Sequence, residues 1–204
     1  ELLDRVGMTG DKSVFAHGIH VTDHECELLA ESGTSIAHCP SSNLKLASGI
    51  ADMPRYDEKG VQVSLGADGA PCNNNLDALV EMRLAALIQK PRHGPEAMPA
   101  RRVVELATRD GAAALDLEDE LGSVEVGKRA DLIVVDLDAD PGASPRGDIH
   151  SRLVYSAHRS NVCDVYCGGR QLVDDGELVG RDVGKVIADA RDAADAVFER
   201  ALDA

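Results

Sequence analysis

The sequence predicts an α/β fold in which a parallel sheet with helical connections comes first and a smaller β-rich segment follows. Three observations support this prediction. Short β-type runs alternate with helical runs up to about residue 117, β-type runs with Gly turns dominate to about residue 180, and residues 181–204 have the apolar period of a surface helix. A chain of 204 residues suits one medium domain, or one domain plus part of another.

The first part of the chain alternates strand and helix patterns after an apparent helix end at residues 2–6. The β-type runs are 13–17, 34–38 and 61–65, and the helical runs are 22–33, 51–59 and a long one that Asn73–Asn75 can cap. Thr22 and Glu25 form the pattern of a capping box, and Gly33 and Gly60 are typical helix ends. Because parallel strands need crossover connections, these runs predict a parallel sheet.

The pattern changes after a further helix expected over residues 99–115. The β-type runs that follow are 122–127, 130–136, 153–155, 162–167 and 171–173. They predict a separate, small all-β piece. Residues 183–204 then place Val, Ile, Ala and Phe on one stripe and acidic residues on the other, which predicts a helix docked by one face.

Composition and charge exclude several classes of protein. With 36 acidic and 21 basic residues the net charge is −15, which disfavours nucleic acid and anionic membranes as partners. No apolar run approaches the roughly 18 residues of a membrane helix. The five Cys residues show no metal-ligand spacing, so we expect reduced thiols in the cytoplasm. Only six residues are Lys, so the acidic surface suits either concentrated salt or an ordinary acidic cytoplasmic protein.

Three residues that can carry chemistry lie at the carboxyl ends of the predicted strands: His17, His38 and Asp68. Active sites of α/β proteins form at this edge of the sheet. A carboxylate with imidazoles can hold a divalent cation that activates water. Taken singly, the histidines suit hydrogen-bonding positions and Asp68 suits a turn. The sequence contains no HxH or HExxH pattern, so a complete metal site is not encoded in this chain.

Four segments of the sequence resemble consecutive motifs of the amidohydrolase superfamily. They are Phe15–His20, Ala37–Gly49, Val63–Ala70 and Gly122–Asp136. Within the superfamily they are most similar to the branch of 5-methylthioadenosine/S-adenosylhomocysteine deaminases, guanine deaminases and triazine chlorohydrolases. The resemblance runs from residue 1 to about residue 180, and its four motifs in order are specific for the branch but not for its substrate.

The resemblance implies a metal-dependent (β/α)8 barrel with a small β-sandwich. Residues 1–117 would be the C-terminal portion of the barrel, with strands 6–8, and residues 118–180 the C-terminal part of the sandwich. Residues 181–204 would be a terminal amphipathic helix. Since a whole barrel needs about 250 residues, we expect this chain to be a C-terminal fragment, with the HxH and HxxE motifs of the family upstream of Glu1.

The resemblance also implies roles for individual residues. Asp68 matches the last metal ligand, which also relays a proton and contacts substrate, and His17 matches a catalytic His that polarises water or steadies developing charge. His38, with Ser42 and Asn43, matches a loop that we interpret as scaffold. Cys72 stands where relatives often carry a small polar residue facing substrate, and it departs from that pattern. The cofactor would be one divalent metal, Zn or Fe.

The function expected from the resemblance is hydrolytic, metal-dependent deamination of a small purine-like substrate of the 5-methylthioadenosine/S-adenosylhomocysteine type. A guanine deaminase or a triazine hydrolase is an alternative of the same class. An alternative of another class is a non-catalytic remnant, or a half-barrel that needs a partner chain. A homo-oligomer of the intact protein is possible in either case.

Overall fold

A computed structural model describes residues 1–139, 141–143 and 147–202 of the chain. It divides into two compact units, residues 1–129 with 136–161 and residues 130–135 with 162 onward. These units reflect packing within this chain. The boundaries predicted after residues 117 and 180 refer to domains of a whole barrel protein, and they stay predictions.

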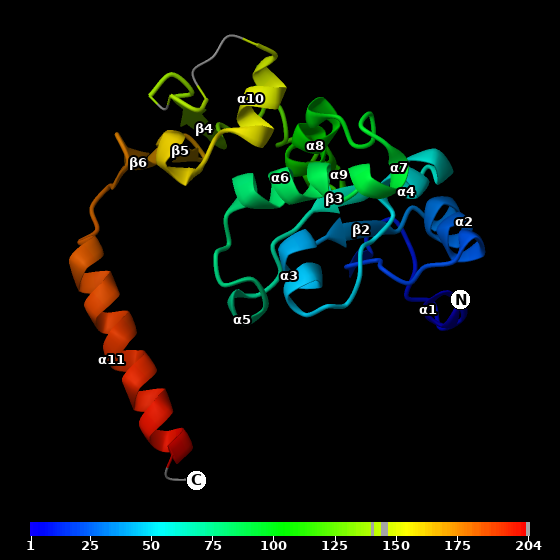
Figure 1. Cartoon of the computed structure of the whole chain (residues 1–204), viewed down its shortest axis with the longest axis horizontal. Coiled ribbons are helices and arrows are strands. Elements are labelled where there is room, and N and C mark those ends of the chain that lie inside the picture. Colours follow the sequence, from blue (N-terminus) through cyan, green and yellow to red (C-terminus); the bar gives the residue numbers. More distant parts are fainter. Residues whose placement is uncertain (140, 144–146, 203–204) are drawn as a thin grey trace. The chain divides into compact units, whose positions relative to one another are not determined.

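The first unit contains a three-stranded parallel sheet in the order β1-β2-β3. Its strands are β1 (Val14–Ala16), β2 (Ser35–His38) and β3 (Val63–Leu65). Phe15 pairs with Ile36, and Ala37 pairs with Ser64. The predicted parallel α/β arrangement is therefore confirmed, and the carboxyl ends of the three strands lie along one edge of the sheet (Figure 1).

Two crossover helices begin and end at the residues that their sequences indicate. In α2 (Asp23–Ser32), Thr22 and Glu25 form the predicted capping box and Gly33 closes the helix with φ +73°. In α4 (Met53–Lys59), the carboxylate of Asp52 accepts a hydrogen bond from the Arg55 amide, and Gly60 closes the helix with φ +72°. Gly favours this left-handed conformation because it has no Cβ.

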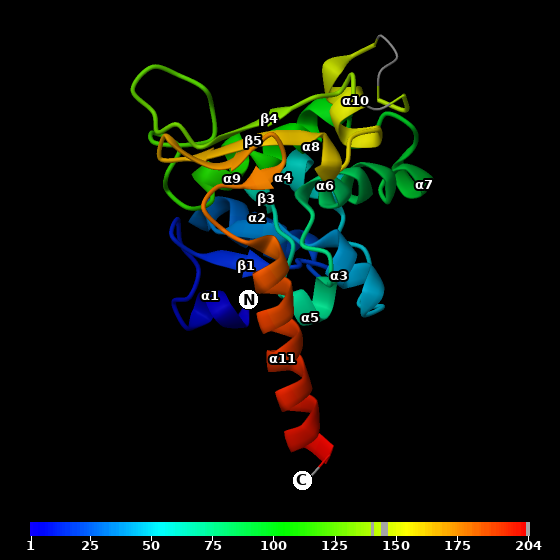
Figure 2. The ribbon, with the colours of Figure 1, turned by 90° about the vertical axis from the view of Figure 1, so that its left-hand side faces the viewer.

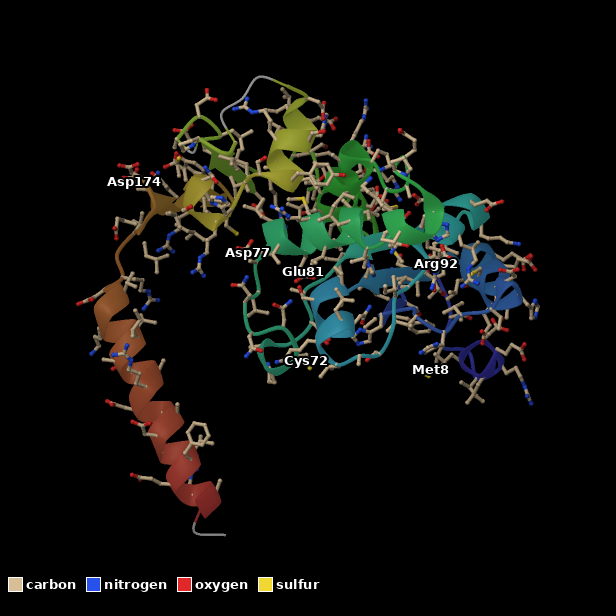
Figure 3. All side chains as sticks on the ribbon, viewed as in Figure 1. Met8, Cys72, Asp77, Glu81, Arg92 and Asp174 are labelled. Atoms are coloured by element: carbon tan, nitrogen blue, oxygen red, sulfur yellow. The ribbon has the colours of Figure 1, made fainter. Side chains whose placement is uncertain are left out.

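The region after β2 contains more helix than the sequence predicts. The segment 40–49, which lies between the predicted strand 34–38 and the predicted helix 51–59, begins with α3 (Pro40–Lys45). The long helix expected after a cap at Asn73–Asn75 is α6 (Ala78–Leu87), and a short helix that the sequence does not predict, α5 (Ala70–Asn73), precedes it. Asp77 caps α6, since its carboxylate accepts hydrogen bonds from the Leu79 and Val80 amides. Figure 3 shows Asp77 at this end of α6.

The predicted helix over residues 99–115 is interrupted at Thr108. It forms α8 (Ala100–Ala107) and α9 (Arg109–Ala113), and both pack on β3. Val103 and Leu106 of α8 are buried with Ile36, Tyr56 and Val63 in the core of this unit.

The remaining helices of the first unit are short, and one of them replaces a predicted strand. They are α1 (Leu2–Arg5), α7 (Lys90–His93), α10 (Ile149–Tyr155) and the 3-10 turn Arg159–Asn161. The prediction of a β-type run at residues 153–155 was wrong. Asp148 caps α10 through the Ser151 amide, and the buried Val154 fixes the helix against its neighbours.

The second unit is built on an antiparallel sheet in the order β4-β5-β6-β7 (Figure 2). Its strands are β4 (Leu132–Val135), β5 (Val162–Cys167), β6 (Arg170–Asp174) and β7 (Glu177–Leu178). The strands predicted at 130–136, 162–167 and 171–173 are confirmed. The run 122–127 is not a strand in the described structure, because Val124 and Val126 are 87% and 109% exposed and have no buried face.

The predicted terminal helix is confirmed as α11 (Val183–Leu202). Every side chain described for it, up to Ala201, is exposed, including Phe198 at 67%. Its docking by the apolar face stays a prediction, and residues 203–204 of the predicted range lie outside the described residues. None of the helices in the described part of the chain is long and apolar enough to span a membrane.

Candidate active site

The two residues predicted to be catalytic meet at the carboxyl edge of the parallel sheet. His17 follows β1 and Asp68 follows β3, and the Nε2 atom of His17 lies 3.9 Å from Oδ2 of Asp68. Both side chains are partly exposed, at 40% and 27%. A substrate or an ion can therefore approach both groups.

The Asp68 carboxylate is held in place by hydrogen bonds from its own loop and from α3. The Ser42 hydroxyl donates to Oδ2 at 2.5 Å, and the Gly69 amide donates to Oδ1 at 2.6 Å. These two donors, with the nearby His17 and the Cys72 thiol, lower the pKa of Asp68 below its usual value. The carboxylate is thus kept ionised, as a metal ligand or proton acceptor requires.

Both residues have an unusual backbone conformation. The φ angles are +72° at His17 and +63° at Asp68, in the left-handed region that costs a non-Gly residue roughly 1–2 kcal/mol. His17 keeps its place in the sheet, because its amide donates to the Ala37 carbonyl at 2.9 Å. Such strain persists only where surrounding contacts fix it, and it is common at functional sites.

One turn of α3 reaches both residues. Ser42 contacts Asp68 as described, and Oδ1 of the next residue, Asn43, lies 2.8 Å from Nδ1 of His17. Ser42 and Asn43 are 1% and 2% exposed. We interpreted this segment as scaffold from its sequence, and the structure shows that it directly contacts the two candidate catalytic side chains.

His38, the third histidine considered, points into the core instead. It is fully buried, and neither ring nitrogen has a hydrogen-bond partner among the described residues. Burial lowers the pKa of His38 to about 4, because the charged imidazole loses its hydration there. His38 is therefore a neutral core residue, separate from the groups that surround Asp68.

Cys72 lies on α5, at the same end of the sheet as α3 (Figure 3). Its thiol is one of the groups that favour the ionised form of Asp68. The side chain is half-buried and its sulfur is a free thiol. The structure thus brings Cys72 close to Asp68, and its predicted contact with substrate stays a prediction.

A buried carboxylate supports the loops that carry these groups. Glu81, on α6, is 1% exposed, and it accepts hydrogen bonds from the Ser41 amide at 3.1 Å and from Nδ2 of Asn73 at 2.8 Å (Figure 3). The same Asn73 nitrogen donates to the Ala67 carbonyl at 2.7 Å. Glu81 therefore connects the residue before Ser42 with the residue before Asp68. Glu81 is not among the predicted site residues, although an acidic residue three and seven positions before the apolar Leu84 and Ile88 of a helix is a detectable signal.

The chemistry of Asp68 fits one position in a metal site. Its carboxylate is ionised, partly exposed and located beside an imidazole. Within residues 1–139, 141–143 and 147–202, no group of three His, Cys, Asp or Glu side chains is arranged to hold a metal ion. The described residues therefore supply at most part of a coordination shell.

A cavity of about 270 Å³ lies elsewhere in the first unit, between α1, β1 and α2. Apolar side chains such as Leu2, Phe15, Leu29 and Ile36 contribute to its lining, and His17 and Asp68 do not. The candidate catalytic groups therefore lie outside this cavity.

Comparison with known proteins identifies relatives over nearly the whole chain. A 5-methylthioadenosine/S-adenosylhomocysteine deaminase of Halobacterium salinarum is 46% identical over 96% of this chain and 45% of its own length. A 5′-deoxyadenosine deaminase of Methanosarcina acetivorans is 43% identical over 98% of this chain and 46% of its own length. The chain thus spans about half the length of the curated relatives it matches.

Solved structures with the same fold include zinc-bound enzymes. An adenosine deaminase from Xanthomonas campestris with bound zinc has a TM-score of 0.93 and 38% identity, covering 97% of this chain and 45% of that protein. An atrazine chlorohydrolase from Arthrobacter aurescens, complexed with zinc, has a TM-score of 0.83 and 29% identity, covering 92% and 42%. The amidohydrolase family pattern matches residues 1–172, which is most of the sequence. This chain belongs to the amidohydrolase family.

Proposed function

We propose that this chain is the C-terminal part of a metal-dependent hydrolase that deaminates an adenosine-like substrate. The observation that carries the proposal is the pairing of His17 with an ionised Asp68 at the carboxyl edge of a parallel sheet. Relatives at 40–46% identity are named 5-methylthioadenosine/S-adenosylhomocysteine or 5′-deoxyadenosine deaminases, which supports this class of substrate. The three parallel strands would be strands 6–8 of a barrel, and the antiparallel sheet part of a β-sandwich.

The proposed metal is Zn²⁺, since the similar adenosine deaminase and atrazine chlorohydrolase contain zinc. Asp68 would be one ligand, and the remaining ligands, with the proton-donating Glu, would come from HxH and HxxE motifs upstream of Glu1. Bound Zn²⁺ would supply a water activated near neutral pH.

The residues of this chain would hold and move protons around that water. Asp68 would accept a proton at its carboxylate and pass it to the departing ammonia, while the Ser42 hydroxyl keeps the carboxylate oriented. His17 presents Nε2 toward Asp68, where it would bind the attacking water and steady the addition step. Cys72, beside Asp68, would contact the substrate near its leaving group.

The test uses the complete gene product with Zn²⁺ and a set of candidate substrates. We expect loss of the adenine chromophore with 5-methylthioadenosine and 5′-deoxyadenosine, and little turnover of guanine or atrazine. Turnover of guanine or atrazine instead would favour the sibling activities. Turnover of none of these substrates would contradict the proposal.

Variants of the complete protein test the assigned residues. Asp68→Asn should abolish nearly all turnover, and His17→Ala should lower it roughly 10²–10⁴-fold. His24→Ala is the matched control, because this histidine is 64% exposed on α2 and its ion pair is with Glu27 of the same helix. Wild-type turnover in Asp68→Asn would exclude its role.

The rival proposal is a non-catalytic remnant or a half-barrel that pairs with a separate chain. The DNA sequence upstream of Glu1 separates the two. An in-frame extension with HxH and HxxE supports the hydrolase, and its lack supports the rival. The free thiols of Cys26, Cys39, Cys72 and Cys167 support our prediction of a reducing, cytoplasmic location.

A further inference from the structure

We propose that Asn43 is a positioning residue that fixes the ring and the tautomer of His17, so that the imidazole carries its proton on Nδ1. The contact joins residues that are 26 positions apart, with Oδ1 of Asn43 at 2.8 Å from Nδ1 of His17. A carbonyl oxygen only accepts hydrogen bonds, so the nitrogen it faces must donate. The neutral imidazole then has its lone pair on Nε2.

The burial of Asn43 makes this contact energetically important. The residue is 2% exposed, and its Nδ2 atom has no hydrogen-bond partner among the described residues. Burying an amide without hydrogen bonds costs about 1–3 kcal/mol in proteins. Since Oδ1 contacts the His17 ring, that contact is what offsets part of the cost. An asparagine buried at this cost is better explained by its contact with the His17 ring than by packing.

The direction of the ring supports the same interpretation. Nε2 of His17 lies 3.9 Å from Oδ2 of Asp68, which is too long for a direct hydrogen bond. That oxygen already accepts the Ser42 hydroxyl at 2.5 Å. An unprotonated Nε2 is therefore free to accept a proton from a molecule bound beside the carboxylate.

Neighbouring residues of one helical turn thus control the two groups separately. Ser42 donates to Asp68, and Asn43 accepts from His17. The chain at His17 is in the left-handed conformation, with φ +72°, so its ring direction is not set by ordinary strand geometry. The contact with Asn43 supplies the missing constraint.

The role in catalysis rests on the proposed function, whereas the tautomer does not. The tautomer can be measured on the 204-residue chain without metal or substrate, by two-bond ¹H–¹⁵N NMR of labelled histidines at about pH 9, where a free imidazole is neutral. His17→Gln assigns the signal. We expect the Nδ1–H form in the wild type and in Asn43→Asp, which keeps an acceptor.

Asn43→Leu should lose the preference for Nδ1–H, because it removes the acceptor. Asn75→Leu is the control, since this asparagine is exposed and should leave the His17 signal unchanged. An Nε2–H form of His17 in the wild type overturns the proposal, and this result does not require Asn43→Leu to fold. A wild-type signal in a folded Asn43→Leu also overturns it.

A second measurement tests the consequence for turnover in the complete protein. Asn43→Leu should lower kcat roughly 10–100-fold, as for other residues that orient catalytic side chains, with a smaller change in KM. If the wild type deaminates the substrate and Asn43→Leu has the same kcat, the positioning role is wrong and the proposed function still holds. Lack of deamination by the wild type would instead remove the proposed function and leave the tautomer result intact.

Discussion

Acidification should destabilise this protein through His38, the buried histidine at the end of β2. Its imidazole is fully buried, and burial alone lowers its pKa from 6.5 to about 4. The folded chain therefore binds this proton less readily than the unfolded chain does. Between pH 6.5 and about 4 the His38 imidazole is protonated in the unfolded state and neutral in the folded state. The free energy of unfolding therefore falls as pH falls through this range.

The size of the effect follows from the same pKa values. Each tenfold change in proton affinity is worth about 1.4 kcal/mol, so the drop from 6.5 to about 4 corresponds to roughly 3 kcal/mol of unfolding free energy. The free energy of unfolding of ordinary domains is about 5–15 kcal/mol, so this effect is a large part of it. Neither ring nitrogen has a partner among the described residues, so no hydrogen bond offsets the loss.

The assay compares urea denaturation of the wild type and His38→Leu at several pH values between about 7.5 and 4.5. Leu has a similar volume and does not titrate. Other groups contribute to both curves, so the difference between them isolates His38. We expect the wild type to lose roughly 2–3 kcal/mol relative to the variant over this range, because the full effect is reached only below pH 4.

A matched control variant and a direct NMR measurement accompany the denaturation assay. His24→Gln replaces a histidine that is 64% exposed, and it should not alter the pH dependence. Parallel wild-type and His38→Leu curves would refute the reasoning. If His38→Leu does not fold, NMR of the wild type decides, because a His38 ring that protonates above about pH 6 cannot have the lowered pKa.

Three further perturbations test other parts of the structure. Glu81→Gln replaces one acceptor oxygen by a donor, next to two groups that already donate, so the free energy of unfolding should fall by about 2–4 kcal/mol in urea denaturation. The exposed Glu31→Gln should change it little. Equal denaturation midpoints for the two variants would contradict the buried network. Gly18→Ala should cost about 1–3 kcal/mol more than Gly60→Ala in the same assay, because both have φ near +60–70° but only at Gly18 does a new Cβ meet other side chains, at 2.9 Å. Equal losses would exclude that clash. Added KCl should raise the midpoint of thermal unfolding, because the acidic side chains behind the net charge of −15 repel one another and salt at about 1 M shortens the Debye length to about 3 Å. A midpoint that does not change with salt would contradict this.

Local signals explain which elements the sequence predicts correctly. The capping box at Thr22 and the closing Gly33 and Gly60 fix the helix ends through short-range contacts. The Leu, Val and Tyr of segment 153–155 predict a strand, yet the Asp148 cap and the burial of Val154 make the segment helical. Tertiary contacts override propensity there, and no local pattern reports them.

The candidate site divides in the same way. The proximity of His17 and Asp68 was predictable, because the carboxyl ends of parallel strands in one sheet lie along the same edge. The contacts of Ser42 and Asn43 were not, since they depend on a helix in a segment that has no clear helical period. Glu81 is on a helix that was predicted, but its partners come from two loops whose paths only the folded chain defines.

The backbone at the site suggests why these supporting contacts are so extensive. His17 and Asp68 occupy a conformation that Gly adopts freely, and His and Asp are among the residues that tolerate it best. A Gly at either position would keep the turn and remove the strain, so turn geometry alone does not account for these side chains. Ser42 and Asn43 contact the two side chains and Glu81 holds the segment before Ser42, while His17 and Asp68 stay 40% and 27% exposed. Such an arrangement is expected where a group must be presented to a ligand, and it is not expected where the only requirement is to reverse the chain.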